Sequence, residues 1–210
     1  MKIILAFILA YLLGSIPSSL WIGKYFYHKD IRQYGSGNLG TTNTFRVLGK
    51  LPGFIVFILD ITKGTIATLL PIFFHIQNIN PLYFGLCAII GHTFPIFANF
   101  KGGKAVATSA GMLLAYAPKF FVAALLLFLL LIFLTSMVSA ASILSMILVS
   151  VGTFVLPKYC PFILPHYDKL LSIIAIILTI FIILRHKANI KRILNGTENH
   201  VPFGLFPRKK

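Results

Sequence analysis

The 210-residue chain is 58% hydrophobic and only 11% charged, with a mean hydropathy of +0.90. This composition excludes an ordinary soluble globular domain and predicts a polytopic membrane protein. The formal charge of +15 comes from 19 Lys and Arg residues against four acidic residues. So few carboxylates exclude a two-metal carboxylate centre, and Cys87 and Cys160 match neither a metal-binding spacing nor a disulfide framework. We expect no metal and no cofactor.

The excess of positive charge has three possible causes: anionic substrates, anionic lipid headgroups, or the Lys and Arg bias of cytoplasmic loops. Nucleic acid is not expected as a partner.

Seven apolar stretches predict an all-α fold with about seven transmembrane helices. In chain order they cover residues 3–23, 51–76, 81–100, 105–117, two helices within 120–157, and 170–184. The polar segment after the first stretch has no small-residue cleavage site near its end. This predicts a retained helix and not a signal peptide.

Two of these stretches have unusual lengths. Residues 105–117 number only 13, too few to cross a bilayer unaided, so we expect a short helix that either crosses fully or stops half-way. Residues 120–157 form an uncharged run of 38, which as one helix would be about 57 Å long against a hydrocarbon core of about 30 Å. We therefore predict a helical hairpin whose turn lies within residues 135–142.

The distribution of Lys and Arg predicts the orientation of these helices. Fourteen Lys and Arg lie on one side, including Arg208, Lys209 and Lys210, against four on the other, with Lys63 inside a helix. The richer side is expected to be cytoplasmic, which places the N-terminus outside and the C-terminus in the cytoplasm. Three polar segments then share the cytoplasmic face: residues 30–46, 91–108 and 185–198. We call them the first, second and third segments.

The first segment contains Gly35, Gly37 and Gly40, which formally match the dinucleotide-binding glycine pattern. We reject that interpretation because no strand precedes the glycines and no βαβ unit fits the apolar pattern. Closely spaced glycines let backbone N–H groups converge on an anion, and Arg46 can close such a site with a bidentate contact. The uncharged donors nearby are Ser36, Asn38, Thr42 and Asn43. A flexible interfacial loop is the open alternative.

The second segment places Gly102, Gly103 and Lys104 before the short fourth helix, which is expected to begin at Ala105. A helix N-terminus beside a lysine favours an anion. It is not a Walker A loop, because none of the three Gly-Lys pairs in the chain is followed by Ser or Thr. For His92 we expect a structural hydrogen bond in preference to catalysis.

The third segment continues from the last apolar helix, and His186, Asn189, and Lys191 or Arg192 lie close together at helical spacing. This face is expected to carry hydrogen-bond donors only. The alternative is an amphipathic surface helix that binds anionic lipid, in which charge matters but His186 and Asn189 do not.

Two charged residues, Asp60 and Lys63, fall three residues apart inside the second apolar helix. Charges inside a membrane need a partner or a function. A salt bridge between them is the simpler interpretation, and the alternative has Asp60 positioning a loop donor such as Arg46.

Together these segments resemble the bacterial membrane-embedded glycerol-3-phosphate acyltransferases that use acyl phosphate as donor. The resemblance covers nearly the whole chain. It rests on GSIPSSLWIGK at 14–24, DIRQYGSGNLGTTN at 30–43 with Arg46, LDITKG at 59–64, GHTFPIFANFKGGKAVAT at 91–108 and RHKANIKRILNGTE at 185–198. Two positions depart from the family: Thr41 stands where Ala is usual, and Ala105 where Gly is usual. A methyl group at Ala105 can narrow the approach of a phosphate to the backbone.

The resemblance implies transfer of a fatty acyl group from acyl phosphate to the sn-1 hydroxyl of glycerol 3-phosphate, giving lysophosphatidic acid and phosphate in phospholipid biosynthesis. It implies one transmembrane catalytic domain, residues 1–210, among the lipids of the bacterial inner membrane, with a cytoplasmic active site. The catalytic residues expected are Ser36, Arg46, Lys104, His186 and Asn189. The substrate-binding residues expected are Gly35, Gly37, Asn38, Gly40, Thr42, Asn43, His92, Gly102, Gly103, Arg192 and Glu198.

Acyl phosphate is an activated mixed anhydride, so positioning and charge stabilisation can suffice for its reaction. The hydroxyl proton is expected to pass either to His186 or, as we favour, to a phosphate oxygen of the donor. The alternative function is a transporter of organic phosphates or other anions, although the chain has no internal repeat and its polar segments share one face. A CDP-alcohol transferase would need several metal-binding aspartates, which this chain lacks.

Overall fold

The computed structural model describes residues 1–207, and within that range every regular element is a helix. Arg208, Lys209 and Lys210, which enter the charge count above, lie outside the described residues. The chain divides into two compact units, residues 1–116 and residues from 117 onward. Three helices are long and apolar enough to cross a membrane, or up to five candidate spans if each of two bent helix pairs counts as one. An all-helical fold is therefore confirmed, while the count of seven spans and their orientation stay predictions.

Unit 1 begins with a broken helix and not with the single helix predicted over residues 3–23. Helix α1 (Lys2–Ser15) and helix α2 (Ser18–Tyr27) meet at an angle of 47°. The break falls at Ile16 and Pro17, because proline has no N–H to donate and disfavours helical geometry in the residue before it. Ile16 accordingly adopts an extended conformation.

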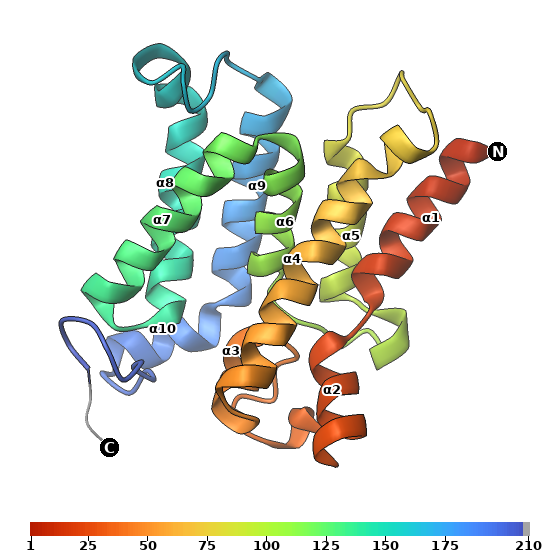
Figure 1. Cartoon of the computed structure of the whole chain (residues 1–210). Helices are drawn as coiled ribbons and strands as arrows, with labels where there is room; N and C mark the ends of the chain where they lie inside the picture. Colours follow the sequence, from red (N-terminus) through yellow and green to blue (C-terminus); the bar gives the residue numbers. More distant parts are fainter. Residues whose placement is uncertain (208–210) are drawn as a thin grey trace. The chain divides into compact units, whose positions relative to one another are not determined.

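The long helix α4 (Lys50–Phe73) is the central element of unit 1 and corresponds to the predicted second stretch. It packs against α6 (Val106–Tyr116) and α1, and α1 packs in turn against α5 (Leu82–Thr93), as Figure 1 shows. The close packing requires small residues, since a Cβ atom at Gly64 would collide with the carbonyl oxygen of Thr108, and one at Gly14 with that of Ala88. Helix α5 ends at Thr93, earlier than the predicted residue 100, because Pro95 follows.

The elements that carry the first and second segments are short. The 3-10 helix η1 (Ile31–Gln33) and helix α3 (Thr41–Val47) flank the glycines of the first segment, and the 3-10 helix η2 (Ile96–Ala98) lies in the second. The first segment thereby connects α2 with α4, and the second connects α5 with α6.

Unit 2 contains the predicted hairpin, formed by α7 (Pro118–Thr135) and α8 (Val138–Tyr159). Its turn at Ser136 and Met137 lies inside the predicted interval. Helix α9 (Lys169–Arg185) starts at the cap of Asp168, whose side chain accepts from the N–H of Leu171 at 3.0 Å. Helix α10 (Lys187–Leu194) follows α9 after a bend of 62°. The third segment therefore turns away from the axis of α9 and does not continue it.

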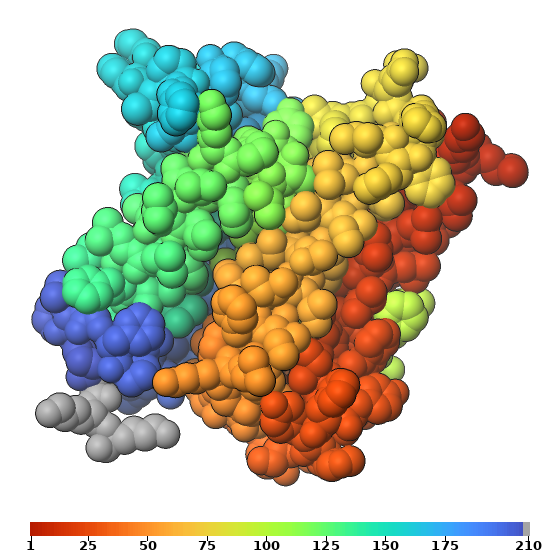
Figure 2. All heavy atoms as spheres, in the orientation of Figure 1, coloured from red at the N-terminus to blue at the C-terminus, as the bar shows by residue number. Residues whose placement is uncertain are grey.

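The chain after α10 folds back over the hairpin turn of unit 2. The N–H of Val201 donates to the carbonyl of Ser136 at 2.8 Å, and the N–H of Leu205 to the carbonyl of Phe133 at 2.9 Å. In Figure 2 this blue segment lies against the green end of α7. These bonds fix the segment that includes Glu198 to the helices of the same unit.

Candidate functional site

The loop of the first segment is braced by one buried side chain, that of Asn43. Its Oδ1 atom accepts from the N–H of Ser36 at 2.9 Å, and its Nδ2 group donates to the carbonyls of Tyr34 and Ile31 at 3.1 and 3.3 Å. Asn43 is 2% exposed, so these bonds occupy its amide. Asn43 holds the loop in shape through these bonds, and its contact with substrate stays a prediction.

The braced loop presents the remaining polar groups of the first segment at the surface. Gly35 and Gly37 adopt φ values of +62° and +68°, the left-handed region that favours glycine. Ser36 and Thr42 are exposed, and Arg46 lies exposed in the last turn of α3. Asn38 and Gly40 are half-buried, and the carbonyl of Gly40 receives the first N–H bonds of α3. The predicted side-chain donors of this segment are thus accessible, apart from Asn43. The backbone N–H groups of Ser36 and Gly37 are instead bonded within the loop, to Asn43 and to the carbonyl of Tyr34.

An ion pair that the sequence analysis missed closes the base of this loop. Arg32 donates to both carboxylate oxygens of Asp30, at 2.9 Å through Nε and 2.6 Å through Nη2, and Lys24 lies 3.6 Å from the same carboxylate. The hydrogen bonds from Arg32 lower the pKa of Asp30 from 3.8 to about 2. The sequence does carry a signal for this ion pair, because an Asp two residues before an Arg at the start of a helix can both cap the helix and bind the arginine.

In the second segment, the two glycines of the Gly-Gly-Lys turn pack onto the end of α5. The N–H of Gly102 donates to the carbonyl of Thr93 and that of Gly103 to the carbonyl of His92, both at 3.1 Å. A Cβ atom at Gly103 would collide with the His92 ring. The two amides are therefore occupied within the chain, so the prediction of an anion site here rests on Lys104 and the start of helix α6.

Helix α6 begins at Val106, one residue later than predicted. Ala105 precedes it with a φ of +62°, which is unfavourable for any residue with a Cβ atom. This conformation gives a physical reason for the glycine that the resembling family usually carries here.

The predicted salt bridge between Asp60 and Lys63 is confirmed, with 2.8 Å between Oδ1 and Nζ. Lys63 also donates to the carbonyl of Ile16 at 3.0 Å, and Nδ1 of His92 lies 3.7 Å from Oδ1 of Asp60. All three charged or titratable side chains are buried. The carboxylate of Asp60 thus faces Lys63 and His92.

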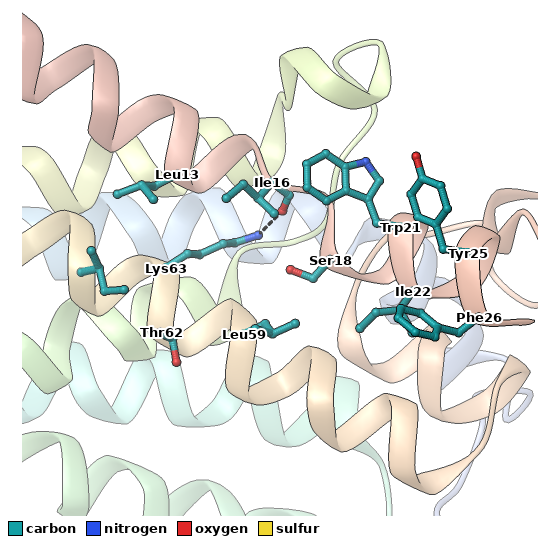
Figure 3. A pocket seen from close by; sticks show the side chains of 11 residues that line it. Leu13, Ile16, Ser18, Trp21, Ile22, Tyr25, Phe26, Leu59, Thr62 and Lys63 are labelled. Atoms are coloured by element: carbon teal, nitrogen blue, oxygen red, sulfur yellow. Dashed lines mark hydrogen bonds between the residues drawn. The ribbon is translucent and has the colours of Figure 1, made fainter.

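A groove of about 410 Å³ opens beside this ion pair in unit 1. Figure 3 shows Trp21, Ile22 and Phe26 of α2 on one side and Leu59 of α4 on the other, with Lys63 reaching toward Ile16. Its lining is almost wholly apolar, so the groove suits a hydrocarbon chain.

The third segment, in unit 2, forms a network around the carboxylate of Glu198. Oε1 accepts from Asn189 at 2.8 Å and from Ser139 at 3.1 Å, while Oε2 accepts from Arg192 at 2.7 Å. Glu198 is only 5% exposed. The prediction that this helix face carries only hydrogen-bond donors is therefore wrong, because the carboxylate of Glu198 folds back onto it as an acceptor. Glu198 and Arg192, predicted to bind substrate, bind each other.

His186 occupies the bend between α9 and α10. Its Nδ1 atom lies 2.8 Å from the carbonyl oxygen of Ile182, and the residue is 3% exposed. His186 and Asn189 are both held by their own unit, as side chains that orient a ligand must be.

Comparison with known proteins identifies the family to which the chain belongs. The sequence profile of glycerol-3-phosphate acyltransferases matches residues 4–196. The glycerol-3-phosphate acyltransferase of Enterococcus faecalis strain V583 is 60% identical over 209 residues, covering 100% of this chain and 96% of the relative. That of Streptococcus sanguinis strain SK36 is 56% identical over 205 residues, covering 98% and 94%. The chain belongs to the glycerol-3-phosphate acyltransferase family.

Solved structures of this acyltransferase family agree with the fold. The crystal structure of PlsY, an integral membrane glycerol 3-phosphate acyltransferase, in its glycerol 3-phosphate form has a TM-score of 0.84 at 37% identity, with 96% of each chain covered. Its lysophosphatidic acid form has a TM-score of 0.80 at 35% identity, with 95% of each covered. The predicted family, membrane class and acyltransferase activity are confirmed.

Proposed function

We propose that this acyltransferase transfers a fatty acyl group from acyl phosphate to the sn-1 hydroxyl of glycerol 3-phosphate. The hydroxyl oxygen attacks the acyl carbonyl carbon, the bond between that carbon and the phosphate oxygen breaks, and the products are 1-acyl-glycerol 3-phosphate and phosphate. The observation that carries this function is the agreement along nearly the whole chain with PlsY, whose solved forms include glycerol 3-phosphate and lysophosphatidic acid.

The polar residues of unit 1 suit the phosphate groups of both substrates. We assign Lys104 and Arg46 to the charge on the departing phosphate, since cationic donors stabilise a developing anion. The exposed side-chain hydroxyls of Ser36 and Thr42 supply uncharged donors for the second phosphate. Gly102, Gly103 and His92 support this arrangement by fixing the turn before Lys104.

In unit 2, we assign Asn189 to substrate orientation, because its Nδ2 group is fixed by Glu198. The hydroxyl proton passes to a phosphate oxygen of the donor, whose second pKa is close to neutral. His186 is the other candidate base. We assign both units to one catalytic domain.

The groove beside α2 and α4 is our candidate for the acyl chain. Its volume of about 410 Å³ and its apolar lining favour a long hydrocarbon chain. Leu59→Trp would fill part of it. We expect this variant to raise KM for a long-chain acyl phosphate more than for a short-chain one, and an equal change for both chain lengths would contradict the assignment.

The chain is proposed to cross or enter the bacterial inner membrane with seven helices, the N-terminus outside and the active site and C-terminus in the cytoplasm. The excess of Lys and Arg on one side supports this orientation. A reporter enzyme that is active only in the cytoplasm, fused to the C-terminus, should be active. A full-length fusion whose reporter enzyme is inactive would show that the C-terminus lies outside the cytoplasm, which contradicts the proposed orientation.

The function is tested by phosphate release from purified, detergent-solubilised protein. Long-chain acyl phosphate is supplied with and without glycerol 3-phosphate, and acyl-CoA replaces it in a parallel reaction. Release should require both acyl phosphate and glycerol 3-phosphate. Activity with acyl-CoA alone would overturn the assigned donor, and no reaction from folded protein would favour the anion transporter.

A further inference from the structure

A buried ion pair lies inside unit 1, and the reaction proposed above uses neither member of it. Asp60 is 2% exposed and Lys63 is 6% exposed. Burying two charges costs several kcal/mol of desolvation, and well-packed apolar residues are often at least as stable in such places. A contribution to stability is therefore a weak explanation for this ion pair. The groups that surround it indicate a second role.

The ion pair contacts the break between α1 and α2. Lys63 donates from Nζ to the carbonyl of Ile16, a group that the break leaves outside regular helix. The same Nζ atom holds Oδ1 of Asp60 at 2.8 Å. The lysine thus fixes the carboxylate relative to α1 and α2 as well as to its own helix α4.

The ion pair also faces His92, near the end of α5. Its Nδ1 atom faces Asp60 at 3.7 Å, while its Nε2 atom lies where a Cβ atom on Gly103 would stand. The carbonyl oxygen of His92 accepts from the N–H of Gly103. One edge of the ring therefore faces the carboxylate, and the other edge packs against the turn that leads to Lys104.

A small cavity joins the same groups. It is lined by Ile16, Pro17, Leu39, Lys63, His92, Pro95 and Gly102. Lys63 and Ile16 also line the apolar groove. The ion pair is thus placed between the groove and the glycine turn, which are the two parts of unit 1 to which we assign the donor substrate.

We propose that Asp60 is a positioning residue, which orients the His92 ring and through it the turn of Gly102, Gly103 and Lys104. Lys63 holds the carboxylate in place. This role rests on the proposed function of the turn as a phosphate site. A displacement of about 1 Å at a reacting group can lower the rate about a hundredfold, so loss of the Asp60 carboxylate should disturb catalysis more than stability.

The test compares Asp60→Asn with the double variant Asp60→Asn and Lys63→Gln in the full-length protein in detergent. The single variant leaves a buried lysine without its carboxylate and should melt at a lower temperature than wild type. The double variant removes that lysine and should recover much of the melting temperature. In both variants kcat/KM should be lower than in wild type by about tenfold or more, because the carboxylate that faces His92 is absent from each.

Thr68→Val is the matched control. Thr68 is buried in the same helix, and its hydroxyl donates only to the carbonyl of Gly64 among the bonds that the structure describes. This variant should shift the melting temperature and leave kcat/KM within about twofold of wild type. A double variant at Asp60 and Lys63 with wild-type kinetics would overturn the positioning role.

Two further measurements cover the remaining outcomes. If the Asn variants do not fold, Asp60→Glu replaces them, because it retains the charge and moves the carboxylate by one methylene group. This variant should melt near the wild-type temperature and have a reduced kcat/KM. Wild-type kinetics in this variant would contradict the positioning role. If wild type binds a non-transferable acyl phosphonate analogue of the donor by calorimetry but transfers no acyl group from acyl phosphate, the proposed function fails. Equal affinities of wild type and the Asp60 variants for this analogue would then reject the positioning role separately.

Discussion

The Nδ1 atom of His186 lies 2.8 Å from the carbonyl oxygen of Ile182, one turn earlier along the chain. A carbonyl oxygen only accepts hydrogen bonds, so Nδ1 carries the hydrogen. In the neutral ring the lone pair is then on Nε2. This tautomer leaves one ring atom, Nε2, with which His186 can accept a proton.

His186→Gln tests whether that atom acts as the base. We expect kcat to fall by about tenfold or less, because the donor phosphate is proposed to take the proton, whereas loss of a general base typically costs about a hundredfold or more. Steady-state phosphate release at saturating substrates measures the change. Lys104→Ala should cause the larger loss. A fall of a hundredfold or more in His186→Gln would assign the base to His186.

Glu198→Gln tests the brace of the third segment. The variant keeps the shape of the side chain but replaces a carboxylate that accepts from Ser139, Asn189 and Arg192. We expect a loss of about 1–3 kcal/mol in stability, because hydrogen bonds to a buried charged group are lost or left unpaired. Thermal unfolding in detergent measures it.

Ser139→Ala is the control for this brace, since it removes one of the three bonds and leaves the charge pair intact. It should cost about 1 kcal/mol or less. An unfolding temperature of Glu198→Gln equal to that of wild type would contradict a bracing role and return Glu198 to the candidates for substrate contact.

Ala105→Gly should stabilise the protein. The φ of +62° at Ala105 is costly for a residue with a Cβ atom, and glycine removes that cost, offset partly by its greater freedom in the unfolded chain. We expect a gain of up to about 1 kcal/mol. Ala110→Gly, inside α6, should instead lose about 1 kcal/mol. The prediction fails if both glycines lower the unfolding temperature equally.

The ion pair of Asp30 with Arg32 predicts a dependence of stability on acid. The pKa of Asp30 is lowered from 3.8 to about 2 in the folded protein, so the unfolded chain binds more protons between these values. Stabilisation by Asp30 is fully present above pH 4 or so and is lost as the pH falls through about 2. Asp30→Asn should therefore be less stable than wild type at neutral pH.

Unfolding midpoints of wild type and Asp30→Asn, compared across this acid range, test the sign. The difference between them should shrink as the pH falls toward 2. Lys29→Gln is a useful control, because it removes a neighbouring charge that no described ion pair involves. A difference that stays constant with pH would exclude Asp30 as its source.

Much of the fold followed from the sequence, because apolar runs of sufficient length have few alternatives to helix inside a membrane. The hairpin within 120–157 and the salt bridge of Asp60 with Lys63 were predicted for this reason and are present. The motifs of the three segments were also sufficient to predict the family. These features depend on residues that are close together in the chain.

The tertiary structure decided which polar groups are bonded within the protein and which lie at its surface. The sequence predicted substrate contacts for Asn43 and Glu198. It did not predict that folding buries both among polar atoms 7 to 59 residues away. A buried polar group bonds to whatever partner the fold brings to it, since an unpaired one is costly. The same holds for the contact of Asp60 with His92, which joins two helices and has no signature in sequence spacing.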